Sequence, residues 1–142
     1  MVNGVIFLCL KKAFDTVDHN IFLTKLRYYG VETATINWLT SYLKNRQKCF
    51  ANGINSSIDY ITRGVPQGSS LGVLLFLIYI NDISKCLDYG VAKLFADDTN
   101  LTFSGCSFPV LQNKMSKDLR GMASWLSAKR LTLDVLKLIL WL

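Results

Sequence analysis

Two adjacent carboxylates, Asp97 and Asp98, are the residues of this sequence with the clearest potential for chemistry. They stand between an apolar run over 91–96 and a short β-prone run over 101–103. Asp and Asn favour turns over strands, so the pattern predicts a hairpin with both aspartates at its bend. Like charges repel unless a cation holds them, and paired hard oxygen ligands suit Mg²⁺ better than Zn²⁺. Taken alone, the pair fits an ordinary solvated turn better than a metal site, since Asp-rich turns are common.

A glycine-containing loop over 63–70 is the second candidate, because it leads into a helix that begins at Ser69 or Ser70. Two glycines around a proline let backbone N–H groups approach a ligand, and a helix N-terminus favours an anion. An ordinary turn with a helix N-cap explains the same spacing at least as well. A third group, at the end of a predicted helix, is interpreted as a solvated helix end, with a phosphate site as the alternative; it consists of Lys44, Arg46 and Lys48.

The first half of the chain predicts one strand, two helices and a hairpin. The apolar run over 5–10 is typical of a strand buried on both faces, and a turn over 11–15 follows it. Asp18 is suited to cap a helix that ends at Gly30, and a second helix begins at Thr33 or Thr35. Residues 48–51 and 57–62 are predicted to form a hairpin around Asn52-Gly53.

The second half alternates helices and strands. Residues 71–83 are apolar nearly all round, which predicts a buried helix ahead of the Asp97–Asp98 hairpin. An amphipathic helix is predicted from apolar residues at steps of three and four: Leu111, Met115, Leu119, Met122 and Leu126. Residues 131–142 are predicted to form an edge strand. The order of elements indicates an α+β fold in which helices pack on one side of a small antiparallel sheet.

Composition narrows the class of protein. The 142 residues suffice for one domain, and a hydrophobic content of 51% with 18% charged residues argues against disorder. The net charge of +6 is compatible with an acidic partner such as nucleic acid, but it is weak evidence for one. Four dispersed cysteines and one histidine argue against a zinc site and for reduced thiols. With no predicted signal peptide or membrane span, we expect an intracellular protein of the cytoplasm or nucleus. Both apolar ends suggest a piece of a larger protein.

Four stretches, in this order, resemble the palm of a reverse transcriptase of the non-LTR retrotransposon type (jockey-like elements). They are Lys11-Lys12-Ala13-Phe14-Asp15-Thr16-Val17-Asp18-His19, Arg63-Gly64-Val65-Pro66-Gln67-Gly68-Ser69, Phe95-Ala96-Asp97-Asp98, and Trp125-Leu126 through Lys137. The resemblance covers essentially the whole chain. It implies a polymerase palm-like fold, with residues 1–142 as a partial reverse transcriptase domain truncated at both ends and lacking fingers and thumb.

The same resemblance implies RNA-directed DNA polymerisation by a two-metal mechanism that uses Mg²⁺, with Mn²⁺ as a possible substitute. The implied partners are an RNA template, a DNA primer and a dNTP. Asp97 and Asp98 would be two of the family's three metal-binding carboxylates, with Asp97 the primary ligand. The third position, on the adjacent strand, holds Cys9, and a thiol is a poor ligand for a hard ion. Rescue by Asp15 is not expected, because the family has an aspartate at that position as well.

Further roles follow from matching positions. Phe14 matches the bulky residue that packs under the incoming sugar, while Gln67 and Gly68 match a loop that contacts nucleotide and template, which Arg63 would brace. Lys137 matches a lysine that the family has in the last of these stretches, a candidate general acid for pyrophosphate departure. The chain departs from the family pattern at Lys129 and Asp134 (usually Asn), at Leu138 (usually Thr) and at Val73 (commonly Pro).

These departures and Cys9 predict that the chain alone has lost polymerase activity. Two alternatives remain from the sequence. One is an active polymerase domain, and the other is a non-catalytic transposon remnant that binds nucleic acid weakly or has a structural role.

Overall fold

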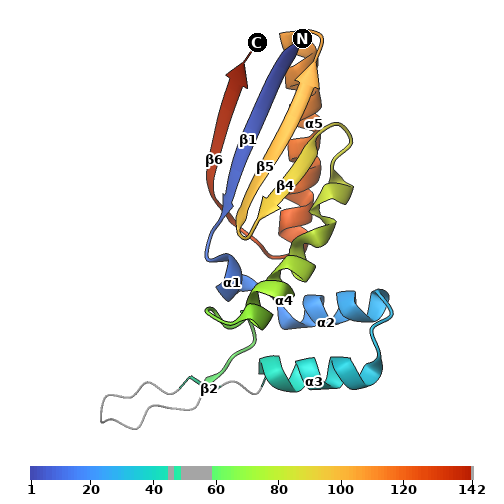
Figure 1. Ribbon diagram of the computed structural model, residues 1–142, viewed down its shortest axis with the longest axis vertical. Helices are drawn as coiled ribbons and strands as arrows, with labels where there is room; N and C mark the ends of the chain where they lie inside the picture. Colours follow the sequence, from blue (N-terminus) through green and yellow to red (C-terminus); the bar gives the residue numbers. More distant parts are fainter. Residues whose placement is uncertain (45–46, 49–58, 142) are drawn as a thin grey trace, which may run out of the picture.

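The computed structural model describes residues 1–44, 47–48 and 59–141 (Figure 1). The predicted α+β class is confirmed. The elements follow in the order β1 (Val2–Leu10), α1 (Ala13–Thr16), α2 (His19–Tyr28), α3 (Thr33–Lys44), β2 (Gln47–Lys48), β3 (Asp59–Tyr60), α4 (Ser70–Ile80), the 3-10 helix η1 (Asn81–Cys86), β4 (Val91–Phe95), β5 (Asp98–Gly105), α5 (Phe108–Ala128) and β6 (Leu133–Trp141).

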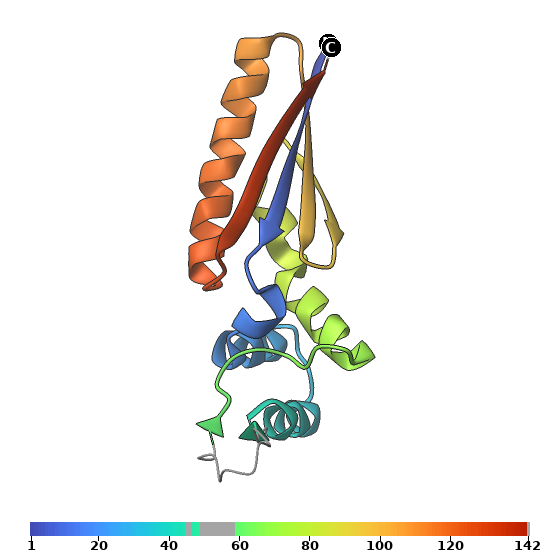
Figure 2. The same cartoon turned by 90° about the vertical axis from the view of Figure 1, so that its left-hand side faces the viewer.

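Four strands form an antiparallel sheet in the order β4-β5-β1-β6, so β6 is an edge strand as predicted. The long helix α5 runs along one face of this sheet, and Figure 2 shows the opposite face without a covering helix. The prediction that all helices pack on one side is wrong for α2 and α3. These two helices lie beyond one end of the sheet, next to α1 and α4 (Figure 1).

Strand β1 has one buried and one accessible face. Ile6, Leu8 and Leu10 point toward α5 and are at most 4% exposed. On the opposite face Val5 is buried, but Phe7 is 38% exposed and Cys9 is half-buried. The prediction of a strand buried on both faces is therefore wrong. The apolar run is continuous, but α5 covers only one side of the sheet, and alternate side chains of a strand point to opposite faces.

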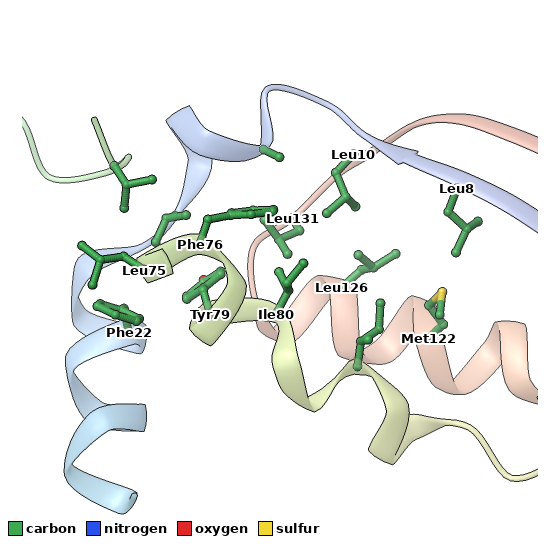
Figure 3. Packing of buried hydrophobic residues seen from close by; sticks show 14 of the residues in the cluster. Leu8, Leu10, Phe22, Leu75, Phe76, Tyr79, Ile80, Met122, Leu126 and Leu131 are labelled. Carbon is green, nitrogen blue, oxygen red and sulfur yellow. The ribbon is translucent and has the colours of Figure 1, made fainter. Parts of the chain in front are cut away.

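The core is shared by the sheet, α5, α4 and α2. Met122 and Leu126 of α5 lie beneath Leu8 and Leu10, and the cluster continues through Ile80, Tyr79 and Phe76 to Phe22 of α2 (Figure 3). The Tyr79 hydroxyl donates a hydrogen bond of 2.6 Å to the Lys129 carbonyl. A buried phenol needs such a partner, and here it ties α4 to the end of α5.

Four predicted helix boundaries are confirmed. Asp18 caps α2 by accepting hydrogen bonds from the backbone N–H groups of Asn20 and Ile21, and the Ser69 hydroxyl caps α4. Gly30, with φ of +78°, follows the end of α2 in the left-handed conformation that favours glycine. Helix α3 begins at Thr33, one of the two predicted positions.

Two other predictions need correction. The predicted turn over 11–15 overlaps a single helical turn, α1, which is entered through Lys12 with φ of +47° and ends at Thr16. The predicted buried helix over 71–83 ends at Ile80 and continues as η1. Its outer face is open, since Val73, Leu74 and Leu77 are 41%, 53% and 37% exposed. A sequence that is apolar all round predicts burial only when neighbours cover every face, and no described segment covers this one.

The remaining predictions agree where the structure describes them. Gln47 pairs with Tyr60 and Lys48 with Asp59, as in the predicted hairpin, while Arg46, Ala51, the Asn52-Gly53 turn and Ser57 lie outside the described residues. The amphipathic stripe is buried in α5 except for half-buried Leu119. None of the helices in the described ranges has the length and apolar character needed to cross a membrane.

Helix α5 also carries a buried carboxylate. Asp118 is 2% exposed and accepts hydrogen bonds from the backbone N–H groups of Asp88, Tyr89 and Gly90, at 3.0, 3.0 and 2.7 Å. These three donors form the loop that enters β4. Asp118 therefore fixes the start of the hairpin that ends in the candidate site.

Candidate active site at the end of the sheet

The β4–β5 hairpin presents the two aspartates at one end of the sheet. Its bend is the two-residue turn Ala96-Asp97, because Phe95 and Asp98 already pair across the strands. Ala96 has φ of +53°, a conformation that L-residues other than glycine adopt at a cost. The prediction of a bend at Asp97 and Asp98 is confirmed for Asp97 and corrected for Asp98, which is the first residue of β5. Asp98 is exposed and Asp97 is half-buried.

Cys9 lies directly opposite Asp98 in the antiparallel register of β1 and β5. Opposite residues in such a pair share a face of the sheet, and this face is the one without α5. Next along β1, the Leu10 backbone N–H donates a 3.3 Å hydrogen bond to the Asp97 carbonyl. The strand position that the sequence assigned to a third carboxylate is thus adjacent to the aspartate pair, and a thiol occupies it.

The surroundings of Cys9 keep its thiol protonated. Burial raises the pKa of Cys9, and its hydrogen bond to the Asp98 carboxylate raises it further. The negative charges of Asp98, Asp97 and Asp134 act in the same direction. Asp134 is the extra residue of a β-bulge, because Cys9 pairs with Val135 and the next residue, Leu10, pairs with Leu133. A neutral thiol in negative surroundings gives no anionic ligand to a hard cation.

The residues at this bend fit a two-metal centre poorly. Among the described residues, no three His, Cys, Asp or Glu side chains are grouped so that they could hold a metal ion. Asp97 and Asp98 can supply carboxylate oxygens, and Mg²⁺ binds through one or two carboxylates when water completes its shell. A second ion would need a further carboxylate beside them, and Cys9 does not provide it.

The other two motifs contact each other. The loop over 63–68 lies against residues 14–19, where the Val65 N–H donates to the Phe14 carbonyl at 2.7 Å and the Gly64 N–H donates to the Val17 carbonyl at 2.8 Å. Gly64 has φ of +92°, and a Cβ on it would stand 3.1 Å from the Asp15 carbonyl oxygen. Glycine is therefore required by both conformation and space.

The predicted nucleotide-contacting residues lie on this joined segment. The Gln67 side-chain amide donates a 3.2 Å hydrogen bond to the Asp15 carboxylate, and Gly68 has φ of +80°. Phe14 is half-buried, with its ring 4.7 Å from that of Phe76. Arg63 is exposed, and its backbone forms an isolated antiparallel bridge with Asp18.

Two residues that the sequence did not single out hold this segment in place. Buried His19 lies with Nε2 2.7 Å from the Gly64 carbonyl oxygen, so the protonated ring nitrogen donates to the loop. Arg130, after α5, donates to the Asp18 carboxylate at 2.8 Å. Asp18 was recognisable as a helix cap, but no local pattern pairs residues 112 positions apart.

Lys137 lies in β6, where its backbone pairs with Phe7. Phe7 is two residues along β1 from Cys9, so the two register rows are about 7 Å apart. Lys137 is thus placed on a strand next to the one that carries Cys9.

Comparisons with known proteins agree with these motifs. A family model described as reverse transcriptase (RNA-dependent DNA polymerase) matches residues 2–141. The probable RNA-directed DNA polymerase from transposon BS of Drosophila melanogaster is 31% identical over 136 residues, covering 86% of this chain and 14% of that protein. The RNA-directed DNA polymerase from mobile element jockey of Drosophila funebris is 35% identical over 81 residues, covering 56% of this chain and 9% of that protein.

A solved structure shares the fold. Apo telomerase from Candida tropicalis, truncated from its C-terminal domain, superposes with a TM-score of 0.73 over 99% of this chain and 31% of that one, at 15% identity. The chain therefore spans a minor part of each of these relatives. By its sequence motifs, the family model and its fold, the chain belongs to the reverse transcriptase family, among the polymerases of non-LTR retrotransposons.

Proposed function

We propose that residues 1–142 are the palm of an RNA-directed DNA polymerase in which the cysteine at position 9 has removed polymerase activity. The observation that carries this proposal is the direct pairing of Cys9 with Asp98 in the sheet. The position next to the aspartate pair holds a thiol whose pKa is raised by burial and by Asp98. Loss of one carboxylate from a two-metal site removes several kcal/mol of transition-state stabilisation, on the order of 10³-fold or more in rate.

In this proposal the predicted nucleotide-contacting residues keep the roles that the resemblance implies. Gln67, Gly68 and Phe14 lie on one hydrogen-bonded segment, which supports a nucleotide and template contact there. Asp97 and Asp98 would bind a single Mg²⁺ or Mn²⁺ weakly. In this proposal the RNA template, DNA primer and dNTP are the partners of the polymerase from which the chain derives, and Lys137 is its general acid.

Metal binding tests the proposal without requiring any other domain. Free Mn²⁺ is followed by electron paramagnetic resonance during titration of the unaltered chain, of Cys9→Asp, and of Cys106→Asp as a matched control at an exposed cysteine. We expect Cys9→Asp to bind Mn²⁺ at least about tenfold more tightly than the other two, because it adds a carboxylate beside the pair. Equal affinities in all three proteins would contradict the assignment of position 9 to the metal site.

Primer extension on an RNA template with Mg²⁺ or Mn²⁺ tests the loss of activity. The unaltered chain should not extend the primer. Extension by Cys9→Asp alone would place the defect at this residue, whereas robust extension by the unaltered chain would refute the loss of activity.

A second candidate function is weak, sequence-independent nucleic-acid binding. This function is favoured by the side chains on the uncovered face of the sheet. Phe95 is 83% exposed there and Phe7 is 38% exposed, and Lys93 of β4 is exposed as well. Exposed aromatic rings with cations are the components of a stacking surface for single strands. The logarithm of the binding constant for an oligonucleotide should fall linearly with the logarithm of the salt concentration. A slope near zero would exclude this role.

A further inference from the structure

Two lysines share one carboxylate where α2, η1 and the end of α5 meet. The Lys25 ammonium donates to the Asp82 carboxylate at 2.7 Å and to the Tyr79 carbonyl at 2.9 Å, and Lys129 Nζ lies 3.3 Å from the other oxygen of Asp82. The side chains of Lys25 and Lys129 are only 6% and 11% exposed. This cluster, hereafter the lysine cluster, therefore holds one positive charge more than it holds negative charges.

An excess charge of this kind is costly in a protein interior. Charges withdrawn from water need partners, and within the described residues neither lysine has an ion-pair partner other than Asp82. Burial lowers the pKa of Lys25, and the charge of Lys129 lowers it further against the opposing effect of Asp82. The Lys25 ammonium is thus held in surroundings that an added anion would improve.

The lysine cluster forms part of the wall of an open groove. The groove has a volume of about 510 Å³ and is lined by Asn20, Ile21, Thr24, Lys25, Tyr28 and Lys129. A third lysine stands close to it, since Lys44 Nζ donates to the Asn20 side-chain oxygen at 3.3 Å. Three lysines and one aspartate give the region a formal charge of +2. Lys44 is one of the three basic residues, with Arg46 and Lys48, for which the sequence left a phosphate site open as an alternative.

We propose that this groove binds a phosphate-bearing ligand of nucleotide size. Its volume lies within the range of small-ligand pockets, about 300–1,000 Å³. The phosphate would lie against Lys25 and Lys129, where it compensates the unbalanced charge. The Tyr28 ring, 85% exposed, and Ile21 offer an aromatic and an aliphatic surface for the rest of the ligand. Of the groove residues, only Lys129 lies in one of the four motif stretches, the one over 125–137, and none is a predicted site residue, so the proposal is separate from the polymerase assignment.

Binding of inorganic phosphate and of adenosine 5′-monophosphate, measured by NMR titration at low ionic strength, tests the proposal. The unaltered chain should bind both, at about millimolar concentration or below. Lys129→Met should weaken both at least about tenfold, because it removes a charged hydrogen-bond donor and leaves the Lys25–Asp82 pair intact. Tyr28→Ala should weaken the nucleotide only, and inorganic phosphate should bind as before.

Two further variants keep the test decisive. Lys114→Met, with the same charge change about 22 Å away along α5, should bind both probes like the unaltered chain. Lys44→Met changes an exposed residue and should weaken both probes without affecting folding, which covers the case that Lys129→Met does not fold. The proposal is overturned if the unaltered chain binds neither probe, if Lys114→Met loses as much affinity as Lys129→Met, or if both Lys129→Met and Lys44→Met bind phosphate normally. If Tyr28→Ala binds the nucleotide as tightly as the unaltered chain does, the proposal that the ligand is of nucleotide size is wrong.

Discussion

Replacing Asp18 with alanine should lower the free energy of unfolding by about 2 kcal/mol, because this buried carboxylate has three partners. It accepts the N–H groups of Asn20 and Ile21 at 3.0 and 3.1 Å, and loss of such a helix cap costs about 1 kcal/mol. It also accepts a charged hydrogen bond from Arg130 at 2.8 Å. The Arg130 side chain is 59% exposed, so solvent screens this pair and we assign it about 1 kcal/mol or less.

Asparagine separates the two contributions at this position. Asp18→Asn keeps a good helix cap but loses the negative charge, so it should lose about 1 kcal/mol or less. Arg130→Met removes the same ion pair from the other side and should have an effect similar to that of Asp18→Asn. Urea denaturation at pH 7 measures each free energy, and the double variant should be little worse than either single one because both remove the same interaction.

The pH dependence of stability tests whether the charge of Asp18 is responsible for this effect. Burial by itself would raise the pKa of Asp18, but the Ile21 N–H and the Arg130 charge outweigh it and hold the pKa below its usual value. A lowered native pKa contributes stability above the unfolded pKa, near 4, and this contribution disappears as the pH falls through the native value. The difference between the unaltered chain and Asp18→Asn should therefore vanish at low pH. An undiminished difference there, or equal losses for Asp18→Asn and Asp18→Ala at pH 7, would refute the reasoning.

Three more outcomes are expected. Gly64→Ala should lower the melting temperature more than Gly68→Ala, because both have positive φ but only at Gly64 does a Cβ meet backbone, at 3.1 Å. Asp118→Ala should cost about 3 kcal/mol in urea denaturation, since three backbone N–H donors lose their buried carboxylate acceptor; a loss below 1 kcal/mol would contradict this role. Asp134→Asn should lower the pKa of Cys9, seen as faster alkylation of its peptide at pH 8, and an unchanged rate would show that the bulge charge does not reach the thiol.

Local patterns predicted most of the elements and the position of the aspartate pair. The Asp18 and Ser69 caps and the Gly30 terminator depend on interactions within a few residues, so their signals are present in short stretches of sequence. The bend at Asp97 is equally local. These predictions are correct because the physical cause of each structure lies between neighbours in the chain.

The contacts that assemble the site could not be predicted in this way. Arg130 meets Asp18 across 112 residues, and His19 meets Gly64 across 45. Lys25 and Lys129 share Asp82 only because α2, η1 and α5 converge. Hydrophobic periodicity assigns a side chain to a face but not to a partner, which also explains why the open face of α4 was predicted to be buried.

The two faces of the sheet explain how the proposed palm would keep its fold without polymerase activity. The register between β1 and β5 is set by the covered face, where Ile6, Leu8, Leu101 and Phe103 are at most 3% exposed. Position 9 is on the other face. A metal-binding carboxylate there would repel the one opposite it, so a neutral thiol removes a repulsion while every apolar contact on the covered face remains. The stability of the fold therefore does not depend on an aspartate at position 9. Only selection for polymerase activity could retain an aspartate there.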